Sequence, residues 1–310
     1  MDKDSDDTPL VSVIIPVYNR EDVIGRALDS VLNQSYRNLE IIVIDDGSSD
    51  QTVHRCRSYG ERIRLITQKN AGPAAARNNG IRHAAGPFIA FLDSDDEWYP
   101  DKIEKQLRFA AEENLGMVIT DSEIQTPGEK RTTYQKSLFS DLLTASPKQV
   151  IELFELLVMQ NFIHLSTVFI SKAAVIEAGL FDETMRVAED TDLWLRVSRQ
   201  LKTGVLNEVL AKRDIREDKL SGDRIQEYLG RIRSFSKLLE ERLTEVEQRQ
   251  ILDRASWVQG RLIYRSLAEK DFKSFRKAFA LQVPRLFSRT FYNGIMSERN
   301  YAPLTGRHHG

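Results

Sequence analysis

The stretch that most constrains the fold is the apolar run at residues 88–92, which passes directly into Asp93, Asp95 and Asp96. An apolar run of this length, bounded by polar residues, is typical of a buried strand in a parallel sheet. The acids then fall at the carboxyl end of the strand, where open α/β sheets bind ligands. Two carboxylates spaced Asp-x-Asp can share a hard divalent cation. The alternative interpretation is a solvated helix N-terminus, which also favours acids.

The residues around this run alternate between strand-like and helix-like patterns. We expect strands at 11–17, 39–44, 63–68, 88–92 and 116–120, and helices at 21–34, from 50, at 74–85 and at 100–113. This alternation predicts an α/β fold with a doubly wound, mostly parallel sheet flanked by helices. Two strands end in acids, Asp45-Asp46 and Asp93-x-Asp95. Acids gathered at one sheet edge repel each other unless a ligand or cation compensates them, so a binding site is expected there.

The second half of the chain mixes both patterns and then becomes helical. We expect a long loop at 125–147, a helix at 150–159, a strand at 166–170, helices at 172–178 and 188–200, and a strand at 203–211. From residue 223 onward the apolar spacing is helical throughout. The sequence therefore predicts a disordered N-terminus (1–9), an α/β domain (10–222) and a helical C-terminal region (223–310).

Composition disfavours several classes of protein. The net charge of −2 argues against a dedicated nucleic-acid binder, and the single cysteine, Cys56, argues against a disulfide scaffold. No apolar run approaches the roughly 20 residues of a membrane-spanning helix, and residues 1–7 are unlike a signal peptide. A cytoplasmic protein is the expectation. Because no glycine-rich loop follows the first strand, an NAD-linked enzyme and a sugar nucleotidyltransferase are both disfavoured.

Five motifs follow one another in a specific order. They are residues 11–19, Asp45-Asp46-Gly47-Ser48, Asn70-x-Gly72 with Ala76-Arg77-Asn78-x-Gly80, Asp93-x-Asp95, and Glu189-Asp190. In this order they resemble the family 2 glycosyltransferases of the GT-A fold, over about residues 10–222. The resemblance implies an inverting enzyme that moves a sugar from a nucleotide-diphosphate donor, commonly a UDP-sugar, to an acceptor hydroxyl with a divalent metal, Mn²⁺ or Mg²⁺.

The same resemblance assigns residues to the donor. Pro16, Tyr18 and Asn19 would line the nucleotide pocket, where a flat ring can stack on the base, although Tyr18 could equally pack at a strand end. Asp46 would accept a hydrogen bond from the base, with Asp45 as the capping partner of the following turn. Arg77 suits a diphosphate or a base edge. Its alternative is an exposed helical arginine.

Metal and catalytic residues are implied in the same way. Asp95 would be the principal metal ligand, and Asp93 would assist through the ribose or through water. Asp190 would be the general base that deprotonates the acceptor hydroxyl, and Glu189 would shape the site. Arg216 occupies the position where many relatives carry a histidine, and an arginine there can pair with phosphate but cannot coordinate a metal.

Two further residues near these motifs are expected to have structural roles only. Asp96 is expected to cap the helix that follows, and His164 is expected to pack in the core or on the surface. The Gln-x-x-Arg-Trp signature of processive synthases is absent, which favours a single addition to a saccharide or lipid-linked saccharide in cell-surface glycan synthesis. Glycoside hydrolysis by Asp95 and Asp190 would leave Asp45-Asp46 unexplained. A catalytically inactive nucleotide- or sugar-binding protein of the same fold is the other alternative.

The end of the chain has a composition of its own. Residues 272–296 are basic and without acids, and their aromatic and aliphatic residues recur at helical spacing. A basic amphipathic helix can lie on an anionic membrane, which here would be the inner face of the cell membrane. A helix packed on the protein with a solvated basic side is the alternative. The sequence leaves the oligomeric state open.

Overall fold

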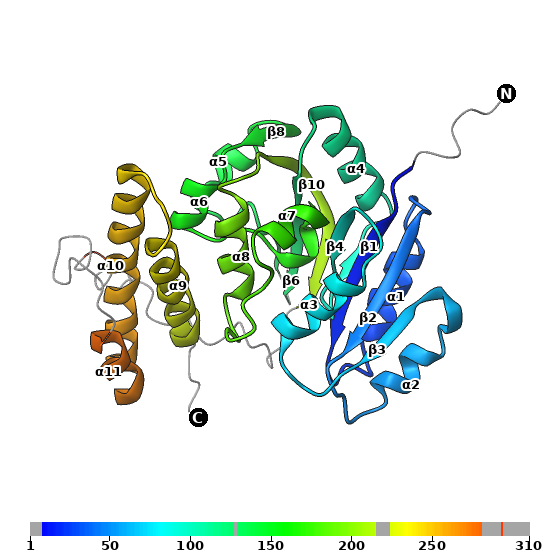
Figure 1. Ribbon diagram of the computed structural model, residues 1–310, viewed down its shortest axis with the longest axis horizontal. Helices are drawn as coiled ribbons and strands as arrows, with labels where there is room; N and C mark the ends of the chain where they lie inside the picture. Colours follow the sequence, from blue (N-terminus) through cyan, green and yellow to red (C-terminus); the bar gives the residue numbers. More distant parts are fainter. Residues whose placement is uncertain (1–7, 127–128, 215–223, 281–292, 294–310) are drawn as a thin grey trace. The chain divides into compact units, whose positions relative to one another are not determined.

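Figure 1 shows a computed structural model of the chain, which describes residues 8–126, 129–214, 224–280 and 293. The chain divides into two compact units, Met1–Glu217 and Asp218–Gly310. We call them unit 1 and unit 2 and describe each by itself.

Unit 1 is built on one large sheet. Its strands are β1 (Val11–Val17), β2 (Leu39–Asp45), β3 (Arg64–Thr67), β4 (Phe88–Phe91), β5 (Glu97–Trp98), β6 (Met117–Thr126), β7 (Glu129–Thr132), β8 (Lys148–Ile151), β9 (Phe169–Ser171) and β10 (Thr203–Asp214). Among the described residues the strand order is β3-β2-β1-β4-β9-β6-β10-β5, with β7 beside β6 and β8 beside β10. The longer ladders, β1–β2 and β6–β10, are parallel, whereas β9 runs antiparallel between β4 and β6. The predicted α/β class, with a mostly parallel sheet, is confirmed.

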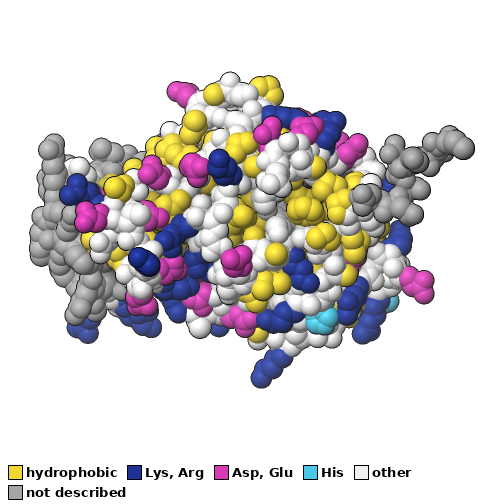
Figure 2. Space-filling view, turned by 45° about the horizontal axis from the view of Figure 1, so that its top comes forward, with side chains coloured by type: hydrophobic (Ala, Val, Ile, Leu, Met, Phe, Trp, Pro, Cys, Tyr) yellow, Lys and Arg dark blue, Asp and Glu magenta, His cyan; other side chains and the backbone are white. Residues whose placement is uncertain are grey.

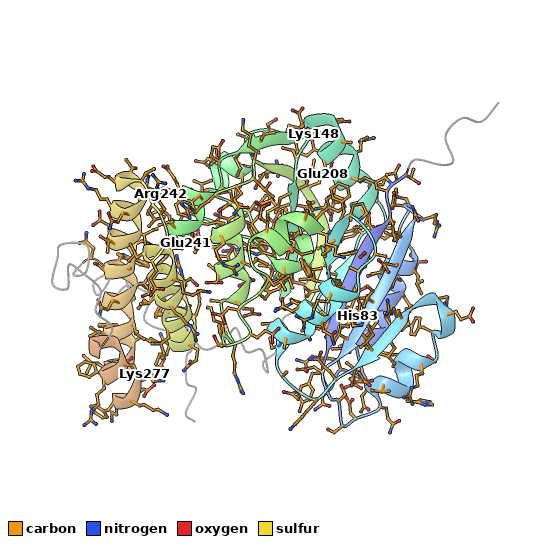
Figure 3. All side chains as sticks on the ribbon, in the orientation of Figure 1. His83, Lys148, Glu208, Glu241, Arg242 and Lys277 are labelled. Carbon is orange, nitrogen blue, oxygen red and sulfur yellow. The ribbon has the colours of Figure 1, made fainter. Side chains whose placement is uncertain are left out.

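Helices cover both faces of this sheet. They are α1 (Ile24–Leu32), α2 (Thr52–Arg57), α3 (Pro73–His83), α4 (Lys102–Glu113), α5 (Ser140–Leu143), α6 (Phe154–Met159), α7 (Lys172–Glu177) and α8 (Glu189–Val197). One apolar cluster joins β1 to the buried faces of α1 and α4, and a second joins β2 to α3. Helices α3 and α7 pass in front of the sheet in Figure 1. At the far edge, Lys148 on β8 donates to Glu112 on α4 at 2.6 Å, and Glu208 on β10 pairs with Lys105 (Figure 3).

A glycine lets α3 approach β1 closely. A Cβ atom added at Gly80 would lie 2.5 Å from Cγ2 of Ile14, which is closer than real side chains come. Because only glycine fits at this contact, the helix lies directly on the strand. Arg77, one turn earlier on α3, is buried as a result. This packing brings Arg77 to the carboxyl ends of the central strands.

Two local predictions in the middle of the chain were wrong. The loop expected at 125–147 contains β7 and α5, and β6 continues to Thr126. The helix expected at 150–159 begins only at Phe154, because residues 148–151 form β8. Both β7 and β8 are four-residue strands added to the sheet by pairing with β6 and β10. Such short polar segments carry no local periodicity, so their partners decide their conformation.

Unit 2 contains α9 (Arg224–Leu239), α10 (Glu245–Ala268) and α11 (Phe272–Ala280). Thr244 caps α10: its hydroxyl accepts from the Glu247 backbone N–H at 3.2 Å, and its own N–H donates to the Glu247 carboxylate at 2.7 Å. Buried apolar residues of α9 face α10, and Gln259 on α10 donates to the carbonyl of Ala278 on α11 at 2.6 Å. Within the described ranges, none of the helices has the length and apolar character needed to cross a membrane.

Candidate active site

The acids after β4 lie in a tight turn. The N–H of Asp96 donates to the carbonyl of Asp93 at 3.0 Å, so Ser94 and Asp95 occupy the two central positions of the turn. The Asp93 N–H donates to the Ser166 hydroxyl at 3.1 Å, which ties the turn to the segment before β9. Asp93 and Asp95 remain partly exposed, whereas Asp96 is buried. The turn therefore presents the Asp-x-Asp pair at the strand end and holds Asp96 inside.

Arg77 joins this turn to the start of α8. Its Nη1 donates to Glu189 at 2.6 Å and its Nη2 donates to Asp93 at 3.0 Å. Only 8% of the Arg77 side chain and 10% of the Glu189 side chain are exposed. Burial acts to lower the pKa of Arg77, but the carboxylates of Asp93 and Glu189 raise it overall. The guanidinium of Arg77 therefore stays protonated. The alternative of an exposed helical arginine is wrong. The Nε of Arg77 has no hydrogen-bond partner in the described part of the chain, which leaves one donor for a ligand.

Asp190 follows Glu189 in the first turn of α8. Burial and then the neighbouring Glu189 carboxylate raise the pKa of Asp190 to about 6. The Thr191 N–H donates to Asp190 at 2.6 Å, and Asn161 in turn donates to the Thr191 hydroxyl at 2.8 Å. The residue before this pair, Ala188, has a φ of 64°, a left-handed conformation that is strained for alanine. Asp190 is thus held in a defined orientation with a carboxyl that ionises near neutral pH.

The ends of β1 and β2 meet on the other side of the site. The Asn19 N–H donates to the Ser48 hydroxyl at 2.9 Å, and the Ser49 N–H donates to Asn19 Oδ1 at 2.8 Å. The Ser48 N–H donates to the Asp45 carboxylate at 3.2 Å, the turn-capping role expected for Asp45. Pro16 is half-buried and Tyr18 is exposed at the end of β1. The structure therefore brings the β1 and β2 motifs together.

Asp46 anchors the loop between β3 and α3. Its Oδ1 accepts from Gln68 Nε2 at 2.8 Å and from the Ala71 N–H at 2.9 Å, and its Oδ2 accepts from the Gly72 N–H at 2.8 Å. Two carboxylate oxygens offer about four acceptor sites, so these three bonds leave one for a ligand donor. Gly72, with a φ of 95°, is the residue whose conformation allows this loop.

A group of ligating atoms beside the turn could hold a cation. One atom each from Asp93, Asp96 and His164 lie within 4.8 Å of one another. Carboxylate and imidazole donors suit Mn²⁺, and the carboxylates alone suit Mg²⁺. Asp95, which the sequence predicts as the principal ligand, is not in this group but adds a partly exposed carboxylate on the same turn. The donor set fits a divalent cation, and the choice of ligand among these acids stays a prediction.

The structure corrects the expectations for Asp96 and His164. Asp96 does not cap the next helix, whose N-cap is Asp101; it accepts from the Ser166 hydroxyl at 2.6 Å and lies 3.3 Å from His164 Nε2. His164 therefore has a carboxylate partner in the site and is more than a packing residue. For Asp96 the sequence carried a weak signal, because Asp96 directly follows the Asp-x-Asp pair. His164 comes 68 residues later in the chain, and it lies near Asp96 because the following strand, β9, pairs with β4. Arg216 lies outside the described residues.

Comparison with known proteins decides the family. A family profile described as "Glycosyl transferase family 2" matches residues 12–181, more than half of the chain. The chain belongs to glycosyl transferase family 2. It is therefore a transferase enzyme, as the motifs predict.

Family members in bacteria resemble the chain over different spans. "Uncharacterized glycosyltransferase RP339" of Rickettsia prowazekii is 32% identical over 95% of this chain and 91% of the relative. An "Uncharacterized glycosyltransferase" of Rickettsia felis is 39% identical over 65% of this chain, which spans about a third (32%) of that relative. The "UDP-Glc:alpha-D-GlcNAc-diphosphoundecaprenol beta-1,3-glucosyltransferase WfgD" of Escherichia coli is 43% identical over 38% of this chain and 47% of the relative.

Solved structures share the fold. S. aureus TarS 1–349 in complex with UDP-GlcNAc is 20% identical with a TM-score of 0.61, over 95% of this chain and 82% of TarS 1–349. The mannosyltransferase PcManGT from Pyrobaculum calidifontis, in complex with GDP-Man and Mn²⁺, is 19% identical with a TM-score of 0.60, over 94% of this chain and 86% of PcManGT. At these identities the likeness establishes the GT-A fold.

Proposed function

We propose that the chain is an inverting, metal-dependent glycosyltransferase that moves one sugar at a time from a UDP-sugar to a hydroxyl of a saccharide or lipid-linked saccharide. The observation that carries the proposal is the bridge made by Arg77. Through it, Asp93 at the end of β4 and Glu189 at the start of α8 share one guanidinium. A strand end suited to a nucleotide diphosphate and a helix start bearing a carboxyl of raised pKa therefore face the same site.

Asp190 is the proposed general base. Inversion requires a group that takes the proton of the acceptor hydroxyl as that oxygen attacks the anomeric carbon. A base is most effective when its pKa lies near the working pH, and burial beside Glu189 gives Asp190 a pKa of about 6. The bonds through Thr191 and Asn161 hold the carboxyl in place.

The donor would be held by groups from three strand ends. Asp95 and Asp93 are the proposed holders of the cation, and Asp96 and His164 are further candidate ligands beside Asp93. When bound, a divalent cation supplies positive charge that offsets the charge of the departing diphosphate. Arg77, whose Nε has no hydrogen-bond partner among the described residues, is proposed to donate to the diphosphate, and Arg216 is proposed to pair with phosphate.

The nucleoside would lie between the ends of β1 and β2. Tyr18, 47% exposed, offers a ring face for the base, and Asp46 retains one acceptor site for its ring N–H. Pro16 and Asn19 would shape the wall of this pocket. Uracil is the proposed base, in keeping with the UDP-Glc and UDP-GlcNAc named for the Escherichia coli relative and for TarS.

The acceptor is proposed to be a cell-surface glycan precursor, in keeping with the diphosphoundecaprenol named for the Escherichia coli relative. Residues 272–296 are the proposed contact with an anionic membrane. On α11, Phe272 is 66% exposed, and Lys273, Arg276 and Lys277 are exposed (Lys277 is labelled in Figure 3). Residues 281–292 lie outside the described ranges. Removal of residues 272–310 should abolish sedimentation with anionic vesicles, and unchanged sedimentation would refute the contact.

The test uses two substitutions with separable effects. With UDP-Glc or UDP-GlcNAc and Mn²⁺, Asp190→Asn should lower the rate of UDP release by about 10²–10⁴-fold, because the base is lost, while UDP affinity by calorimetry changes only a few-fold. Asp95→Ala should weaken UDP binding in Mn²⁺ and leave the metal-free affinity unchanged.

The exposed Asp141 on α5 gives the matched control, since Asp141→Asn removes the same charge away from the site. Loss of UDP affinity in Asp190→Asn equal to its loss of rate would remove Asp190 from the base role. Binding of UDP that is indifferent to both Mn²⁺ and Asp95→Ala would contradict the metal assignment.

A further inference from the structure

Unit 2 gathers three arginines that lie against aromatic rings. We call Arg231 on α9 and Arg254 and Arg261 on α10 the arginine cluster. The guanidinium carbons of Arg254 and Arg261 lie 3.7 and 4.5 Å from the ring centroid of Trp257. Arg261 also lies 5.4 Å from the ring of Tyr228 on α9. Positions 254, 257 and 261 are spaced by three and four residues, so they share the face of α10 that meets α9.

Among the residues that the structure describes, the charge of Arg254 has no acidic partner. Arg254 is 8% exposed, its Nε is buried without a hydrogen-bond partner, and it makes no hydrogen bond or ion pair with the described residues. A ring engages the face of a guanidinium and leaves the N–H groups at its edge without acceptors. Burial, and then the charges of Arg231 and Arg261, lower the pKa of Arg254 to about 9. A carboxylate that acts on the cluster is Glu227, which favours the charge of Arg231.

We propose that the arginine cluster is a binding site for a phosphate group, either a phosphomonoester or a diphosphate. A buried cation with neighbours of the same sign is costly unless an anion compensates it. Phosphate carries up to two charges and at least three acceptor oxygens, which suit the N–H groups of Arg254 beside two further guanidinium charges, whereas a carboxylate carries one charge and two oxygens. Trp257 and Tyr228 lie against the guanidinium groups of Arg254 and Arg261, so the Arg254 donors are oriented before the ligand arrives.

The arginine cluster lies within unit 2, and its proposed role does not rest on the function proposed above. Two sources could present the phosphate: a soluble phosphate or diphosphate, and the phosphate headgroup of a lipid. Both use the same chemistry at the arginine cluster. The experiment distinguishes them by the form in which phosphate is supplied.

The test measures binding of pyrophosphate to the full-length chain by calorimetry, at constant ionic strength set with chloride. The wild-type protein should bind, and Arg254→Met should weaken the affinity by about tenfold or more, because a charge-assisted hydrogen bond is lost. Arg249→Met is the matched control, since Arg249 is exposed on the same helix, and its affinity should stay within about twofold of the wild type. Phosphate bound at any other site contributes equally to all three proteins.

A second arm supplies phosphate on vesicles of phosphatidylcholine with or without phosphatidic acid. Vesicle binding that requires phosphatidic acid and is lost in Arg254→Met assigns a lipid source, and pyrophosphate binding alone assigns a soluble source. Either result supports the site. If Arg254→Met, folded by circular dichroism, binds pyrophosphate and vesicles as the wild type does, or if the wild type binds neither, the proposal is overturned. If the wild type binds sulfate as tightly as pyrophosphate, the proposal is also overturned, because the binding is then a general effect of anions.

Discussion

Two buried arginines, Arg77 in unit 1 and Arg254 in unit 2, have opposite surroundings. Their exposed fractions are alike, 7% and 8%. Arg77 donates to two carboxylates, those of Glu189 and Asp93. Arg254 stacks on Trp257, and burial, then the like charges of Arg231 and Arg261, lower its pKa. The same side chain is therefore a structural bridge in one place and an uncompensated charge in the other.

The difference shows that burial alone does not give an arginine its role. For Arg77 the desolvation cost is offset by two charge-assisted hydrogen bonds, which in turn hold two acids beside each other. For Arg254 a stacked ring offsets part of the cost and leaves the N–H groups available. Figure 2 shows acidic and basic side chains interspersed on one face of the molecule.

The largest expected effect is the loss of the Arg77 bridge. Arg77→Met should lower the free energy of unfolding by about 3–5 kcal/mol, because it leaves the buried Glu189 carboxylate and Asp93 without a cation. Urea denaturation measures the change. Arg82→Met is the control on the same helix: Arg82 is 55% exposed and 3.7 Å from Glu183, so a change below about 1 kcal/mol is expected. Equal effects of the two substitutions would contradict the bridge.

A smaller effect of opposite sign is expected for Arg254. Arg254→Met should leave the free energy of unfolding unchanged or raise it by about 1–2 kcal/mol in phosphate-free buffer, because an uncompensated charge is replaced by an apolar chain of similar length. The same urea titration, run with and without pyrophosphate, measures this. Destabilisation as large as that of Arg77→Met would remove the distinction between the two arginines.

The smallest effect is expected for Glu189. This residue is an acidic partner of Arg77, and Arg254 has no such partner among the described residues. The pKa of Asp190 is about 6, above the ordinary 3.8, so the rate of transfer should fall as pH decreases through about 6, where the base becomes protonated. Glu189→Gln removes a charge that raises this pKa, so the acidic limb should move to lower pH. The pH dependence of kcat/KM measures the limb. A limb that stays in place, or moves to higher pH, would separate Glu189 from the titration of Asp190.

Much of unit 1 was predictable because its signals are local. The strands β1 and β2 are apolar runs whose bounds are nearly those predicted, and the acids fall at strand ends. The motif order pointed to the family before any fold was known. The short strands β7 and β8 and the pairing of His164 with Asp96 were not predictable, since each depends on a partner strand or on β9.

The sequence by itself determined the alternation of strands and helices, the edge at which the acids gather and the family, because these follow from local periodicity and from the order of short motifs. Only the tertiary structure decided which charges are compensated. Arg77 and Glu189 are 112 residues apart in the chain, and Arg254 is a buried residue of α10, which packs against α9 and α11. Whether a buried charge is compensated depends on the groups that lie around it, and the packing of segments distant in the chain decides which groups those are.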